Sequence, residues 1–123
     1  MNAALELARI SDARITLLHV WSLPKFGYAE GLSWPIDGLE KAAREALETA
    51  LAATSKVHAK TDALLRQGNE SAQILETLKD IGCDLVVMGT HGRRGLPRLM
   101  LGSVTGEIIR LSSMPVVTVG PPK

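Results

Sequence analysis

Residues 84–105 read DLVVMGTHGRRGLPRLMLGSVT, a pattern that predicts a strand, a glycine-rich loop and the start of a helix. The predicted strand Asp84–Met88 contains the short, continuously apolar run Leu85–Met88, which is typical of a parallel strand covered on both faces. The helix is expected over Ser103–Leu111, directly after the loop. A buried strand that leads through a loop into a helix predicts a parallel α/β architecture.

The segments on either side repeat this alternation of strands and helices. Apolar runs rich in β-formers predict strands, and apolar residues at helical spacing predict helices. The order predicts a single α/β domain over residues 1–123, doubly wound, with a mostly parallel sheet and helices on both faces. The remaining predicted elements are a helix over Asn2–Ser11, a strand over Arg14–Trp21, a helix from Asp37 to about Ser55, a strand over Val57–Leu65, a helix from about Glu70 to Ile81 and a strand over Pro115–Val119.

The composition excludes several classes of partner. Fourteen basic and thirteen acidic residues leave a net charge of +1, which gives no overall field to attract nucleic acid or an anionic membrane. Arg93, Arg94 and Arg98 could form an RNA patch, but interleaved aromatic residues are missing. The single cysteine, Cys83, suits a reducing compartment and a packing role, and no apolar run is long enough to span a bilayer. We therefore expect a cytoplasmic protein.

The loop and the helix after it predict an anion site. Gly89 and Gly92 permit tight turns and let backbone amides approach a ligand closely. Gly102 and Ser103 open the next helix, whose unpaired amides and dipole favour a phosphate, and the hydroxyl groups of Ser103 and Thr105 add donors. His91 lies inside the loop and is a candidate contact to phosphate or ribose. Because neither a Walker sequence nor a dinucleotide fingerprint occurs, a plain strand-to-helix connection is the alternative.

Catalytic machinery is not evident in the sequence. Neither a Ser/His/Asp nor a Cys/His set can be identified, and the sequence places no carboxylate as a general base. His19 is expected to be structural and His58 to face solvent. No pair of histidines or carboxylates has the spacing of metal ligands. These observations argue against an efficient hydrolase.

The glycine spacing carries a family resemblance. Gly89, Gly92, Gly102 and Ser103 reproduce the G-x2-G-x9-G-(S/T) signature of the ATP-binding branch of the universal stress protein family. The segments ARITLLHVW, DLVVMGTHG and LGSVTGEIIRLSSMPVVTV also resemble that family, so the resemblance covers nearly the whole chain. It implies ATP, with Mg²⁺ arriving on the nucleotide, as the ligand. The implied contacts are Gly89, Gly92, Gly102, Ser103, Val104 and Thr105 around phosphate and ribose, Met88 at the edge, and Val20 against adenine.

One part of the family pattern has no counterpart here. Members begin with a strand of the type ILVPVD, whose Asp lies near adenine and ribose, and this chain opens on the helix instead. The resemblance places that strand between those at Arg14–Trp21 and Asp84–Met88. We expect the difference to reflect a shortened chain, a missed start site, N-terminal residues absent from the structure, or strand exchange between subunits.

The resemblance also implies an assembly and a role. The apolar strand Pro115–Val119 would lie at the sheet edge and pair with its copy in a homodimer. The expected function is an ATP-binding regulatory protein of a stress response. Two alternatives stay open, a slow ATP hydrolase at the same site and a dimeric interaction module that binds no nucleotide.

Overall fold

A computed structural model describes residues 2–22, 36–89 and 102–120. Helices and strands alternate along the chain, and the strands pair in parallel, so the α/β class is confirmed. The chain divides into two compact units, residues 1–69 and residues 70–123, which are described separately. The single domain over 1–123 stays a prediction.

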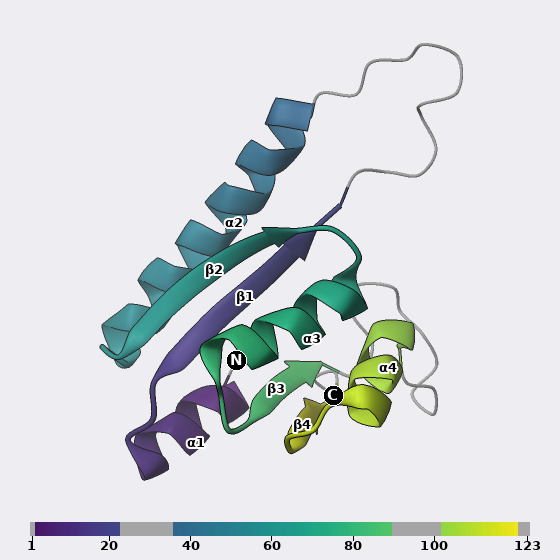
Figure 1. The fold of residues 1–123 in the computed structure, drawn as a ribbon. Coiled ribbons are helices and arrows are strands. Elements are labelled where there is room, and N and C mark those ends of the chain that lie inside the picture. Colours follow the sequence, from purple (N-terminus) through teal and green to yellow (C-terminus); the bar gives the residue numbers. More distant parts are fainter. Residues whose placement is uncertain (1, 23–35, 90–101, 121–123) are drawn as a thin grey trace. The chain divides into compact units, whose positions relative to one another are not determined.

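The first unit is a strand–helix–strand crossover preceded by a helix. Strands β1 (Ile15–Trp21) and β2 (Thr61–Gln67) pair in parallel, from Ile15 opposite Thr61 to Trp21 opposite Gln67. The long helix α2 (Ile36–Val57) connects them and packs on both, as Figure 1 shows. A parallel pair requires such a crossover, and an apolar stripe on α2 gives the strands a face to cover.

The corner between helix α1 (Asn2–Ser11) and β1 is fixed by polar contacts from the other end of the crossover. Asp12 has a positive φ of 53°, which turns the chain out of the helix. The Nζ of Lys60 donates to Oδ2 of Asp12 at 2.9 Å, and Nε2 of His58 donates to the carbonyl oxygen of Ala13 at 2.6 Å. The residues that follow α2 therefore hold the turn that leads into β1.

The second unit contains a shorter parallel pair and two helices. Strand β3 (Val86–Gly89) pairs with β4 (Val116–Val119), and helix α3 (Glu70–Ile81) packs against helix α4 (Ser103–Leu111). Helix α3 stops at Gly82, whose φ of 61° few other residues adopt. Ile108 of α4 is fully buried, and Leu78 and Thr77 of α3 are buried as well.

The described strands form two two-stranded sheets, with the orders β1-β2 and β3-β4. Each pair joins strands that are neighbours in the chain, as a βαβ unit does.

Two predicted strand starts are wrong: β3 begins at Val86 rather than Asp84, and the larger error is at the start of β2. The sequence predicts a strand from Val57, but α2 continues through Val57, and the amide of His58 still donates to the carbonyl of Thr54 at 2.9 Å. Strand β2 begins only at Thr61, where it meets the first residue of β1. The loose alternation of Val57, Ala59 and Thr61 resembles a strand, whereas pairing with a distant partner decides where the strand starts.

Candidate functional site

The second unit brings the end of β3 to the start of α4. Gly89 is the last residue of β3, and Thr105 lies in the first turn of α4. The Thr105 hydroxyl donates a hydrogen bond of 2.6 Å to the Gly89 carbonyl oxygen. This bond joins the two elements that flank the glycine-rich segment.

The N-terminus of α4 has the properties of an anion site. Gly102 is the N-cap residue, with φ −62° and ψ 154°, and within the described residues no side chain caps the helix there. The Gly102 carbonyl accepts the first helical bond, from the amide of Gly106 at 2.9 Å. The amides of Ser103, Val104 and Thr105 have no partner inside the helix, and the helix dipole favours a negative charge beside them.

The predicted contacts differ in exposure. Ser103 is exposed at the helix start, Val104 and Gly102 are half-buried, and Thr105 is buried. Met88 is half-buried in β3, opposite Thr118 of β4, and Gly89 is exposed. The second unit therefore brings most of the predicted phosphate contacts to the junction of β3 and α4.

Three other predicted contacts are not part of that junction as described. Val20 lies in β1 of the first unit, half-buried and opposite Arg66 of β2. His91 and Gly92 lie outside the described residues. Their roles stay predictions.

Thr105 is used differently from what its position suggests. Only 4% of the residue is exposed, and its one hydroxyl proton is donated to Gly89. A hydroxyl group has a single proton to donate, so in this arrangement Thr105 cannot also donate to a phosphate. The sequence contains the hydroxyl but gives no signal that a carbonyl 16 residues earlier accepts from it.

The cysteine of the second unit has a packing role. Cys83 Sγ lies 3.2 Å from Met114 Sδ and joins the turn before β3 to the turn before β4. Burial raises the pKa of the Cys83 thiol, which disfavours the reactive thiolate. This agrees with the expected packing role.

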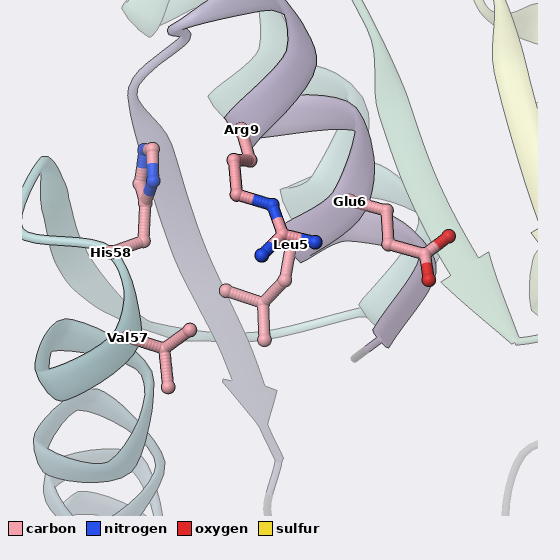
Figure 2. A pocket seen from close by; sticks show the side chains of 5 residues that line it. All are labelled: Leu5, Glu6, Arg9, Val57 and His58. Atoms are coloured by element: carbon pink, nitrogen blue, oxygen red, sulfur yellow. The ribbon is translucent and has the colours of Figure 1, made fainter.

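The first unit has a separate hollow of about 220 Å³, lined by Leu5, Glu6, Arg9, Val57 and His58. Figure 2 shows that Leu5 and Arg9 come from α1 and that Glu6 is turned away from Val57 and His58. His58, which was expected to face solvent, is half-buried and hydrogen-bonded to Ala13. This hollow therefore lies over a structural corner.

Two kinds of feature are not found in the described parts of the chain. Residues 2–22, 36–89 and 102–120 hold no group of three or more His, Cys, Asp or Glu side chains that could bind a metal ion. Within these same ranges no helix is long and apolar enough to cross a membrane.

Comparisons with known proteins agree on one family. The model of the universal stress protein family matches residues 1–120. A universal stress protein of Methanocaldococcus jannaschii is 30% identical over 123 residues, which cover 98% of this chain and 72% of that protein.

Solved structures show the same fold. The universal stress protein UspA from Lactobacillus plantarum has a TM-score of 0.76 at 18% identity, covering 96% of this chain and 85% of that one. A universal stress protein from Archaeoglobus fulgidus in complex with dAMP has a TM-score of 0.65 at 24% identity, covering 94% and 81%. Because the family model spans almost the entire sequence, this chain belongs to the universal stress protein family.

Proposed function

We propose that this chain binds an adenine nucleotide with its phosphates at the N-terminus of α4, beside the end of β3. The observation that carries the proposal is the N-terminus of α4, which has no side-chain cap in the described residues and is held against Gly89 by Thr105. Helix N-termini next to a glycine-rich segment are suited to phosphate groups.

The family supports the choice of ligand. The Archaeoglobus fulgidus relative was solved in complex with dAMP, an adenine nucleotide. In our proposal Gly89, Gly92, Gly102, Ser103 and Val104 surround phosphate and ribose. Met88 borders the site, His91 contacts phosphate or ribose, and Val20 contacts adenine. ATP carrying Mg²⁺ is the proposed nucleotide.

The proposed role is regulation of a stress response by nucleotide binding, in the cytoplasm. The proposed assembly is a homodimer through β4, and residues 1–123 form one domain in it. Val116, Val117 and Val119 make β4 apolar, and in the described sheet only β3 pairs with it. An apolar edge strand can pair with its copy in a second subunit.

The sharpest test uses the first residue of α4. Ser103→Pro removes a backbone N–H that the helix does not use, and proline is favoured at a first helical position. Gly102 already has the extended conformation that a residue before proline needs. The substitution should therefore leave the helix intact and remove one amide donor from the site. Ser103→Ala, which keeps this amide, is the matched control.

The measurement is calorimetric titration of AMP, ADP and ATP with Mg²⁺ into the parent and both variants. We expect parent Kd values on the order of micromolar, a loss of about tenfold or more for Ser103→Pro, and a smaller loss for Ser103→Ala. Circular dichroism should show equal helix content in all three proteins. Absence of binding by the parent would overturn the proposal.

A further inference from the structure

The hydrogen bond from Thr105 to Gly89 differs from the bond that a helical threonine usually makes. A threonine inside a helix commonly donates its hydroxyl to the carbonyl four residues earlier in the same helix. Thr77 of α3 does this, since its Oγ1 donates to the carbonyl of Gln73 at 2.7 Å. Thr105 lies in the first turn of α4 and has no carbonyl four residues earlier in its own helix, and it donates to the last carbonyl of β3, in a different element.

This bond controls how the two sides of the proposed site face each other. Gly89 ends the strand, Gly102 caps the helix, and the segment between them contains the remaining glycines of the signature. Thr105 is buried, so water does not compete freely for its hydroxyl. The bond therefore fixes the first turn of α4 against the end of β3.

We infer that Thr105 is a positioning residue of the nucleotide site, which holds the amides at the start of α4 and the backbone at Gly89 in one arrangement. The inference rests on the proposed function. It replaces the expectation from the sequence that the Thr105 hydroxyl contacts the phosphates. The hydroxyl acts through Gly89, and the first-turn amides of α4 contact the ligand.

Three variants separate this role from a general effect on folding. Thr105→Val is nearly the same shape but lacks the hydroxyl, and Thr105→Ser restores the hydroxyl. Thr77→Val is the matched control, because it removes a buried threonine hydroxyl whose acceptor, the carbonyl of Gln73, lies in the same helix. Thr105→Ala also lacks the hydroxyl and has a smaller side chain, and it replaces Thr105→Val in the experiment if that variant does not fold.

The first readout is the affinity for AMP, measured by calorimetry. We expect Thr105→Val to bind about tenfold or more weakly, with Thr105→Ser close to the parent. Thr77→Val should bind as the parent does, even where its melting temperature falls. Equal weakening by Thr105→Val and Thr77→Val, or a failure of Thr105→Ser to restore binding, would overturn the inference.

The second readout needs no nucleotide. The carbonyl carbon of Gly89 should change its chemical shift in Thr105→Val and keep the parent value in Thr105→Ser and Thr77→Val. An unchanged Gly89 signal in Thr105→Val would contradict the positioning role of Thr105 and leave the proposed function untouched. If the parent fails to bind AMP while the Gly89 signal behaves as expected, the proposed function fails and the hydrogen bond stands.

Discussion

Asp12 ends α1 in a backbone conformation that most residues avoid. Its φ is 53°, and Asp and Asn are among the residues that tolerate this region. The hydrogen bond from Lys60, together with its charge, lowers the pKa of Asp12 from its ordinary value of 3.8. The carboxylate thus serves both the turn and the contact with the segment before β2.

We expect Asp12→Asn to lower the melting temperature slightly at neutral pH, because Asn keeps the turn but loses the ion pair with Lys60. Since the pKa is lower in the folded protein, the carboxylate stabilises the fold above 3.8, and this contribution is lost as the pH falls through the folded value. The difference in melting temperature between parent and variant should therefore disappear in acid. Thermal melts at neutral and acidic pH measure this difference.

The Lys60→Met background supplies the control for that experiment. With the cation removed, Asp12→Asn should make little further difference at neutral pH, because the two changes remove the same interaction. If the melting temperatures of the parent and Asp12→Asn differ by the same amount down to strongly acidic pH, the ion pair does not stabilise the corner.

Two glycines of the second unit, one after the end of α3 and one inside α4, give a prediction at the scale of the helix. Gly82 ends α3 with φ 61°, and Gly106 lies inside α4, yet a Cβ at either position would meet no atom within 4 Å. Gly82→Ala should destabilise by about 1 kcal/mol because of backbone strain. Gly106→Ala should stabilise by roughly 0.5–1 kcal/mol, because alanine loses less conformational freedom in a helix.

Chemical denaturation of the two variants beside the parent measures both effects, and each variant controls for the other because the added atom is the same. Stabilisation by Gly82→Ala would contradict the left-handed end of α3. A destabilised Gly106→Ala would mean that the methyl group meets an obstacle inside α4.

Helices were the elements that sequence reasoning located best. The predicted spans Asn2–Ser11, Glu70–Ile81 and Ser103–Leu111 agree with α1, α3 and α4, because helical periodicity and stop residues are local signals. The start of β2 could not be found in this way, because Ile15 sets it from a distant part of the chain. The hydrogen bond of Thr105 was missed for the same reason, since its acceptor lies in another element.

For the whole molecule, the proposed pairing of β4 with its copy in a homodimer can be tested directly. Thr118 is the exposed residue of β4, so Thr118→Lys should leave the monomer folded. In a pair of β4 edges related by a two-fold axis, the new charge would lie near its own copy and repel it. We expect the dimer Kd to rise about tenfold or more, as measured by light scattering over a concentration series.

Thr118→Ser is the control, because it keeps a small polar side chain at the same place and should dimerise as the parent does. A monomeric parent would refute the proposed assembly. An unchanged dimer with lysine at position 118 would exclude β4 as its interface.

The corner at the start of β1 also has a consequence for the order of events during synthesis. Its hydrogen bonds join Ala13 to His58 and Asp12 to Lys60, pairs that are 45 and 48 residues apart. At roughly 5–20 residues per second, the ribosome adds His58 about 2–9 s after Ala13. During that interval β1 has been made and β2 has not. An apolar strand waiting for its partner is the kind of surface that chaperones protect, so the interval is the period when the nascent first unit most needs such protection.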